Sequence, residues 1–453
     1  MEQLLDTQTD LEANPWPLNA QFTEEGLIVA GCTASEIVHE FGTPVLVVDE
    51  ADFRHRCAQF ATAFSQVAWA VKSFPVQALA RIAYEEGLEL LVSTEGELDT
   101  CLRAGVPGSS IIMHGNNKST REIEAAMRCG VALLTVDNLQ ELELVASMAE
   151  EADHVQPILI RITPGVDVDT HAYIATGHAT SKFGLPISEG LAALAIDTAQ
   201  RSSHLNLRGV HVHLGSQLLT ATPYLQAICV VMNFLSEVRR STGFTAEVLD
   251  LGGGYGVTYE REERLSIPRL AATLQTEIAS VSSALGLPIP ELIVEPGRVI
   301  SAGACVTLYE VGHVKAIPHG ETYVAVDGGM SDNIRPALYG AHHEAALASR
   351  RSQCSSARVS IVGKHCETGD VLRRHASAPS DLIPGDLLAM ATTGAYTYAM
   401  SSNYNKVPRP PVVLAREGRT RLIVRRETFD DLAARDLAPS EHEGVYASST
   451  RVK

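Results

Sequence analysis

Ala68-Trp69-Ala70-Val71-Lys72 is the first of eight short apolar runs that recur between residues 67 and 294. A helical pattern, with Leu, Ile and Ala at three- and four-residue spacing, follows most of these runs. The alternation predicts an α/β fold, a (β/α)8 barrel whose active site lies at the C-terminal ends of the strands. The predicted strands are residues 68–72, 89–93, 111–114, 132–137, 158–163, 207–214, 248–251 and 292–295, and the predicted helices are residues 76–86, 96–104, 119–129, 138–149, 189–201, 223–240 and 267–285.

The sequence pattern changes after residue 302, where apolar runs continue without long helical patterns between them. Two of the runs flank Glu417-Gly418-Arg419, which is a hairpin signal. We expect a second, mostly antiparallel β domain, and we expect residues 43–48 to pair with it, because the barrel is already complete. The predicted domains are an N-terminal segment of residues 1–49, a barrel of residues 50–302 and a β domain of residues 303–453, and the later runs are residues 323–326, 358–362, 387–392, 412–416 and 421–424.

Composition excludes several classes of protein. The 453 residues are 45% hydrophobic, which is enough for a large core. The 36 Lys and Arg against 54 Asp and Glu give a formal charge of −18 without a basic run, which argues against a nucleic-acid partner. The N-terminus lacks a signal-peptide pattern and no stretch reaches the roughly 18 apolar residues of a membrane span, so we expect a cytoplasmic protein without a membrane partner. The eight cysteines form no CxxC pair, so neither a zinc site nor a disulfide framework is expected.

Five of the predicted strands run into a residue that could hold or use a cofactor: Lys72, His114, Arg161, His213 and Glu295. Lys72 ends the first strand, where a partly desolvated amine could form an imine with an aldehyde, although such a lysine is often only a solvated charge. The glycines 252 to 254 follow the seventh strand and would let backbone N–H groups approach an anion, although such a run can be only a tight turn. Glu295 could pair with a protonated pyridine nitrogen, or form a simple ion pair with Arg298.

Two histidines lie on one predicted strand. His211 and His213 alternate with valines, so both side chains point to the same face of the strand. A structural histidine is the simpler interpretation and suits His211 better. A metal site would need a third ligand, and none stands nearby at a recognisable spacing, so we expect no metal.

Seven motifs occur in the order of a known family. They are Lys72, His213-Leu214-Gly215-Ser216-Gln217, Gly252-Gly253-Gly254, Glu295-Pro296-Gly297-Arg298, Arg335-Pro336-Ala337-Leu338-Tyr339, Cys366-Glu367-Thr368-Gly369-Asp370 and Gly394-Ala395-Tyr396. On these motifs the chain resembles the fold-type III pyridoxal-phosphate (PLP) decarboxylases, and most of all the diaminopimelate decarboxylases, from about residue 16 to residue 435. The resemblance implies a PLP-dependent carboxy-lyase that converts meso-2,6-diaminopimelate to L-lysine and CO2, the last step of lysine biosynthesis.

The resemblance also implies roles for cofactor-binding residues. Lys72 would hold PLP covalently, His213 would stack on its ring, and Glu295 would bind the pyridine nitrogen. The phosphate would be held by Ser216, by the backbone of Gly252, Gly253 and Gly254, and by Tyr396, with Arg298 near both the phosphate and the substrate.

Further residues are implied in substrate binding and catalysis. Arg335 and Tyr339 would bind the distal carboxylate of the substrate, beside Tyr396, and Glu367 would bind its distal ammonium. Cys366 would donate a proton on the face opposite Lys72. Because the two residues at positions 366 and 367 reach the partner's site in this family, the resemblance implies a homodimer with shared active sites.

Arg335 also has a physical argument of its own. A diamino dicarboxylic acid needs a cation for its far carboxylate, which a polyamine precursor such as ornithine lacks, and a guanidinium suits that planar anion. Outside the family context, Arg335 could instead form a salt bridge between domains. The alternatives are a decarboxylase of another basic amino acid, such as ornithine, arginine or carboxynorspermidine, a racemase on the same barrel, and a binding protein without catalysis.

Three positions depart from the family pattern. Leu91 stands where an Asp beside the cofactor is usual, Trp69 replaces a common Tyr, and Lys364 precedes Cys366 by two residues. None of them removes a group that imine formation requires, so the catalytic interpretation stands.

Overall fold

Eight parallel strands form a closed barrel in the computed structural model, which describes residues 14–166, 181–260, 262 and 265–437. The strands are β5 (Gln66–Ala70), β6 (Glu89–Val92), β7 (Ile111–Met113), β8 (Leu133–Val136), β9 (Gln156–Thr163), β11 (Leu205–His211), β12 (Val248–Asp250) and β13 (Glu291–Val294). The ring closes because β13 pairs with β5 and β8 pairs with β9. All eight predicted strands are confirmed, with ends shifted by a few residues.

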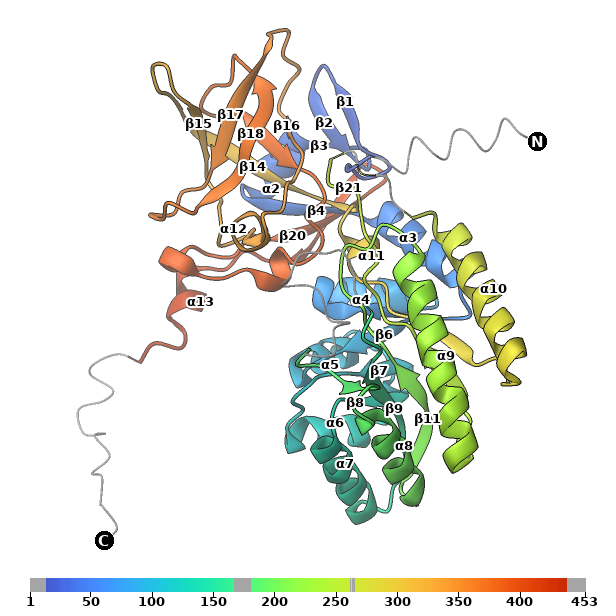
Figure 1. Cartoon of the computed structure of the whole chain (residues 1–453). Helices are drawn as coiled ribbons and strands as arrows, with labels where there is room; N and C mark the ends of the chain where they lie inside the picture. The colour runs from blue at the N-terminus through green and yellow to red at the C-terminus, as the bar shows by residue number, and fades with distance from the viewer. Residues whose placement is uncertain (1–13, 167–180, 261, 263–264, 438–453) are drawn as a thin grey trace.

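Helices cover the outside of this barrel, as Figure 1 shows. The seven predicted helices are confirmed as α4 (Gln77–Glu85), α5 (Glu95–Arg103), α6 (Thr120–Cys129), α7 (Leu139–Glu151), α8 (Leu191–Arg201), α9 (Thr222–Thr242) and α10 (Ile267–Leu285). Sequence analysis missed α3 (Glu50–Ala63), which packs between α10 and α4. Its buried apolar residues are Phe53, Cys57 and Phe60, at the spacing of a helical stripe, so the signal was present.

Local sequence explains where these helices begin and end, and α6 is an example. The Ser119 hydroxyl accepts from the Glu122 N–H, and the Glu122 carboxylate accepts from the Ser119 N–H at 2.9 Å. This reciprocal pair satisfies donors that the first turn leaves without partners. Gly130 ends the helix with φ +67°, a conformation that costs a glycine little.

The barrel is filled by side chains. Its interior layer is a cluster to which seven of the eight strands contribute: Ala68, Ala70, Leu91, Ile112, Leu133, Leu159, Val248 and Ile293. A larger buried cluster lies between the strands and the helices, and Trp69 belongs to it. Trp69 contacts Phe53 of α3 edge to face, with ring centroids 5.6 Å apart. The packed interior leaves the strand ends as the place for a site.

A second, mostly antiparallel sheet is built from the C-terminal part and one N-terminal strand. Its order is β18-β17-β15-β14-β4-β20-β21, and β19 also pairs with β14. β4 (Val45–Asp49) lies antiparallel to β14 (Cys305–Ala316) and parallel to β20 (Val412–Arg416), which confirms the predicted pairing of residues 43–48. The remaining strands are β15 (Thr322–Val326), β16 (Ala345–Leu347), β17 (Ser356–Val362), β18 (Val371–Pro379), β19 (Leu387–Met390) and β21 (Arg419–Val424). Of these strands, β14, β16 and β18 are not among the predicted runs.

Short elements complete the described chain. They are β1 (Gln21–Thr23), β2 (Gly26–Val29), β3 (Cys32–Thr33), α2 (Ala34–Phe41), β10 (Leu185–Pro186), α11 (Arg298–Ser301), α12 (Arg335–Tyr339) and α13 (Phe429–Ala433), with the 3-10 turns η1 (Val71–Ser73), η2 (Gly108–Ser110), η3 (Tyr398–Met400) and η4 (Tyr404–Lys406). The N-terminal elements share a buried cluster with β4, β14 and β20, so the start of the described chain packs on the β domain. No helix among the described residues is long and apolar enough to cross a membrane.

Candidate active site

A cavity of about 570 Å³ lies at the C-terminal ends of the barrel strands, with residues of the C-terminal part on its other side. This volume is typical of a small-molecule site. Nine predicted site residues line it: Lys72, His213, Ser216, Gly254, Glu295, Arg298, Arg335, Tyr339 and Tyr396. Four predicted site residues are not part of its lining: Gly252, Gly253, Cys366 and Glu367. Most of the predicted site therefore comes together within one chain.

Lys72 lies just beyond the end of its strand. β5 ends at Ala70, and Lys72 occupies a 3-10 turn, η1 (Val71–Ser73). The Ser73 hydroxyl donates to the Ala70 carbonyl at 2.8 Å, and the Ser73 carbonyl accepts from the Tyr396 N–H at 2.9 Å. Hydrogen bonds therefore connect this turn both to the end of β5 and to the C-terminal segment that carries Tyr396. Lys72 is exposed and lines the cavity, because the residue follows the strand instead of lying within it.

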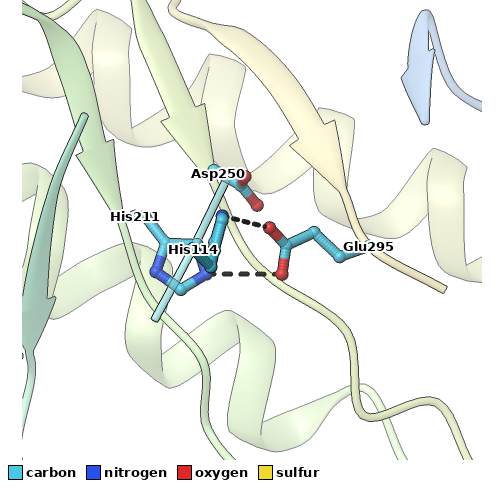
Figure 2. A group of neighbouring side chains, drawn as sticks. All are labelled: His114, His211, Asp250 and Glu295. Carbon is cyan, nitrogen blue, oxygen red and sulfur yellow. Dashed lines mark ion pairs between the residues drawn. The ribbon is translucent and has the colours of Figure 1, made fainter. Parts of the chain in front are cut away.

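Glu295 lines the cavity and belongs to a buried cluster of four residues, which Figure 2 shows. Its Oε1 lies 2.9 Å from His114 Nε2, and its Oε2 lies 3.4 Å from His211 Nε2. Asp250 completes the cluster from the end of β12. The predicted alternative of a Glu295–Arg298 ion pair is not found among the described ion pairs, because Arg298 donates elsewhere.

The charges in this cluster are unequal. Burial opposes ionisation of Glu295, yet His114 and His211 hold its pKa well below the ordinary value. Burial, and then the neighbouring Glu295, raise the pKa of Asp250 well above its ordinary value. Burial lowers the pKa of His211 to about 3 and also lowers that of His114. Within the cluster the neighbouring groups therefore favour the ionised form of Glu295 and the protonated form of Asp250.

The four donor atoms lie within 4.8 Å of one another, and their types would suit a metal. Sequence analysis found no third ligand near His211, because the other three residues come from distant strands. His114 Nε2 lies 2.9 Å from Glu295 Oε1, while its hydrogen bond joins it to Thr135 Oγ1 at 3.0 Å.

His213 is fixed by the glycine-rich segment. Its Nδ1 accepts from the Gly253 N–H at 3.2 Å, while the Gly252 N–H donates to Asp250 Oδ1 at 2.8 Å. These two N–H groups therefore face protein acceptors, and only Gly254 of the three glycines lines the cavity. Gly252 has φ +67°, and a Cβ there would lie 2.5 Å from the Val212 carbonyl oxygen. Only glycine allows this approach to the segment after β11 that carries His213.

Arg298 and Tyr259 form a buried pair at the cavity wall. Arg298 donates to Tyr259 Oη at 2.7 Å and to Ser216 Oγ at 2.9 Å, and its guanidinium lies 4.9 Å from the centre of the Tyr396 ring. Burial opposes ionisation of Tyr259, but Arg298 and then Arg335 lower its pKa. Sequence analysis missed Tyr259, because nothing in the local sequence marks a tyrosine that contacts two distant arginines.

Arg335 is also buried, with 5% of its surface exposed, at the start of α12. Its guanidinium lies 5.3 Å from the ring centre of Tyr339 and 5.9 Å from that of Tyr259. The described ion pairs include no acidic partner for Arg335, so the domain-linking salt bridge is not supported. The Nε atoms of Arg298 and Arg335 are buried without hydrogen-bond partners among the described residues. Such a pair suits an anionic ligand.

Cys366 and Glu367 lie outside the cavity of their own chain. Both are exposed on the loop between β17 and β18. Asp370 fixes this loop, since it accepts from the Met330 N–H at 2.6 Å and from the His365 N–H at 2.7 Å. An ordered loop thus presents the two side chains outward.

The three departures from the family pattern have different consequences. Leu91 lines the cavity and belongs to the barrel interior, so this position is apolar. Burial raises the pKa of Glu97, in the first turn of α5, and the charge of Lys72 partly offsets this. Trp69 lies in the cluster outside the strands, and Lys364 is exposed, and neither lines the cavity.

Comparisons with known proteins agree with this geometry. The family model for the pyridoxal-dependent decarboxylase, pyridoxal binding domain, matches residues 50–302. The diaminopimelate decarboxylase of Corynebacterium efficiens is 43% identical over 444 residues, which are 96% of this chain and 97% of that protein. That of Mycobacterium bovis is 44% identical over 440 residues, which are 94% and 98% of the two chains. The structure of the diaminopimelate decarboxylase of M. jannaschii with L-lysine is similar at a TM-score of 0.87 and 32% identity, covering 93% of this chain and 98% of that one.

Proposed function

The chain belongs to the diaminopimelate decarboxylases among the pyridoxal-dependent decarboxylases, and from this premise we propose which residues carry each part of the reaction. The reaction releases CO2 from meso-2,6-diaminopimelate and leaves L-lysine, with PLP as the cofactor. When bound, PLP forms a covalent link to the substrate amine and accepts the electrons that the departing CO2 leaves.

The groups around the cavity fit this cofactor. Lys72 offers an exposed amine for the aldehyde, and the neutral ring of His213 offers a flat surface. Glu295 brings a buried anion to the cavity wall for the pyridine nitrogen. Ser216, Gly254, Arg298 and Tyr396 would hold the phosphate. We assign Gly252 and Gly253 to the positioning of His213 and Asp250, since their N–H groups donate to those residues.

The buried pair of arginines carries the proposal for the substrate. Arg298 and Arg335 line the cavity that also contains Lys72, and each has an Nε without a partner among the described residues. Arg335 with Tyr339 would bind the distal carboxylate, and Arg298 with Tyr396 would lie beside the phosphate and the substrate. A substrate without the second carboxylate leaves a buried cation unpaired, which is costly.

Proton transfer and recognition of the distal amine are assigned to the partner's loop. We propose that two chains associate so that Cys366 and Glu367 of one chain reach the cavity of the other. Their exposure on an ordered loop supports this assignment. Cys366 would then deliver the proton opposite Lys72, and Glu367 would accept from the distal ammonium. We also propose residues 50–302 as the cofactor-binding barrel, residues 303–453 as the β domain and residues 1–49 as a segment that completes it.

A substrate comparison tests this function. Purified protein with PLP is expected to release CO2 from meso-diaminopimelate far faster than from ornithine, arginine or lysine. The reason is that only diaminopimelate has a carboxylate for Arg335. CO2 would be measured for each amino acid at equal concentration, and release from ornithine alone would contradict the proposed substrate.

Substitution of Arg335 tests the distal-carboxylate assignment. In Arg335→Met, kcat/KM for meso-diaminopimelate is expected to fall by roughly 30- to 5000-fold, because truncation of a buried charge partner costs about 2–5 kcal/mol. Arg374→Met is the matched control, since Arg374 is an exposed arginine on β18 that does not line the cavity. A loss of less than threefold in Arg335→Met would remove Arg335 from substrate recognition.

A further inference from the structure

Tyr259 lies beside the two buried arginines of the cavity. It lines the cavity with only 7% of its surface exposed. Its Oη accepts from Arg298 Nη1 at 2.7 Å, and its ring centre lies 5.9 Å from the guanidinium carbon of Arg335. The ring centres of Tyr339 and Tyr396 lie at similar distances from that carbon, 5.3 and 5.8 Å. Three tyrosines therefore lie around Arg335, and Tyr259 is the one without a role in the proposed function.

The contacts of Arg298 place Tyr259 at the end of the cavity that holds Arg335. The Arg298 guanidinium is a planar fork, which donates from Nη2 to Ser216 Oγ at 2.9 Å and from Nη1 to Tyr259 Oη. Ser216 is among the residues proposed for the phosphate, so Tyr259 contacts the other arm of the fork. Its ring faces Arg335, the group proposed for the distal carboxylate.

The Tyr259 hydroxyl still has a proton to donate. A phenol can accept and also donate through its one O–H, whereas an arginine offers donors only. Neither Arg298 nor Arg335 can therefore accept the Tyr259 proton, and none of the described residues accepts a hydrogen bond from it. Burial opposes ionisation of Tyr259, but Arg298 and then Arg335 lower its pKa, which makes the hydroxyl a better donor. An anion in the cavity would provide the acceptor.

The phenol ring is held from behind by a neutral histidine. His343 contacts the ring of Tyr259 edge to face, with ring centroids 5.2 Å apart and planes at 89°. The side chain of His343 is fully buried, and its Nδ1 donates to the Ala391 carbonyl at 3.0 Å. Burial, and then Arg335, lower the pKa of His343 to about 3, so it packs there as a neutral ring. The Tyr259 N–H donates to Glu262 Oε2 at 2.9 Å, so ring and backbone are both positioned before a ligand binds.

We propose that Tyr259 is a specificity-determining residue, whose hydroxyl donates a hydrogen bond to the distal carboxylate of the substrate, the group that Arg335 binds. The inference rests on the proposed function, because the role of Arg335 comes from there. It adds a neutral donor from the segment after β12 to the groups that α12 supplies. Two segments distant in the sequence would then recognise one carboxylate.

The test compares two ligands that differ only in this carboxylate. L-lysine retains the distal carboxylate of meso-diaminopimelate, whereas cadaverine is the same diamine without it. In PLP-loaded Tyr259→Phe, the dissociation constant of L-lysine is expected to rise about 10- to 150-fold, the scale of a lost hydrogen bond to a charged group. That of cadaverine is expected to change by less than about threefold, because cadaverine offers the hydroxyl no acceptor. Isothermal titration calorimetry measures both constants.

The ratio of the two dissociation constants separates this role from a structural one. Loss of the hydroxyl also removes an acceptor from Arg298, but that change should affect both ligands alike, because both occupy the same cavity. Tyr84→Phe is the matched control, since Tyr84 is a half-buried tyrosine on α4 that does not line the cavity, and both constants should stay unchanged. If Tyr259→Phe does not fold, Tyr259→Met, which also lacks the hydroxyl, replaces it.

The outcomes distinguish the inference from the function on which it rests. If wild-type protein binds L-lysine far more tightly than cadaverine and Tyr259→Phe keeps the same ratio, the role of Tyr259 is overturned while that of Arg335 stands. If wild-type protein binds the two ligands equally well, recognition of the distal carboxylate by Arg335 fails, and the role of Tyr259 fails with it.

Discussion

Replacement of Lys72 by alanine is expected to abolish CO2 release from meso-diaminopimelate. The rate should fall by at least about three orders of magnitude, the scale on which groups that act directly in the chemistry contribute. No other lysine lines the cavity as described, so no second amine can take over the covalent link to PLP. The absorbance band of that link should disappear from the purified variant, even with PLP added in excess.

The control for this experiment is Lys315→Ala. Lys315 is an exposed lysine on β14 that does not line the cavity, so its loss should leave both CO2 release and the absorbance band unchanged. Circular dichroism of Lys72→Ala should match that of the wild type, because the exposed Lys72 side chain contributes little to packing. Retention of the band in Lys72→Ala would assign the covalent link to another residue.

The barrel could be predicted because its periodicity is local. Each strand is a short apolar run and each helix a stripe, so the alternation can be recognised without any long-range contact. The end of the first strand was less predictable. Apolar character continues through Val71, but pairing with β6 stops at Ala70, and the Ser73 hydroxyl closes a turn there. The exposure of Lys72 follows from that turn and not from the apolar pattern.

Nine of the cavity-lining residues were predicted from motifs, whereas the contact of His114 with Glu295 and the place of Tyr259 in the cavity wall were not. His114 and Glu295 lie on opposite parts of the chain, and only closure of the barrel brings His114 Nε2 to 2.9 Å from Glu295 Oε1. Tyr259 has no motif of its own, and its contact with Arg298 depends on how the segment after β12 folds over the strand ends. The spacing of residues along the sequence does not reveal either of these contacts.

The barrel and the C-terminal part of the chain supply different groups of the proposed active site. The barrel supplies Lys72, His213 and Glu295, which face the reacting centre, and these are placed by paired strands. Arg335 and Tyr339 come from α12, beyond the barrel, and approach from the other side. Substrate choice can therefore vary with the β domain while the barrel keeps the cofactor chemistry.

Mixed dimers provide the sharpest test of the shared site. Lys72→Ala and Cys366→Ala are each expected to be inactive or nearly so, with Cys366→Ala lowered by about 10²- to 10⁴-fold as the loss of a proton donor. When the two are coexpressed, half of the dimers formed at random contain one subunit of each kind. Each mixed dimer then has one site with intact Lys72 and a partner's intact Cys366, so about one quarter of wild-type activity should return.

A second mixture makes this result specific. Lys72→Ala with Glu295→Ala should restore no activity, because both lesions lie in the barrel and every site of a mixed dimer keeps one of them. Cys354→Ala, at another exposed cysteine, should remain fully active. Mixed dimers isolated through two different tags would be assayed for CO2 release. Inactive mixed dimers of Lys72→Ala and Cys366→Ala would mean that Cys366 does not complete the partner's site, and its exposure on the loop between β17 and β18 would then need another explanation.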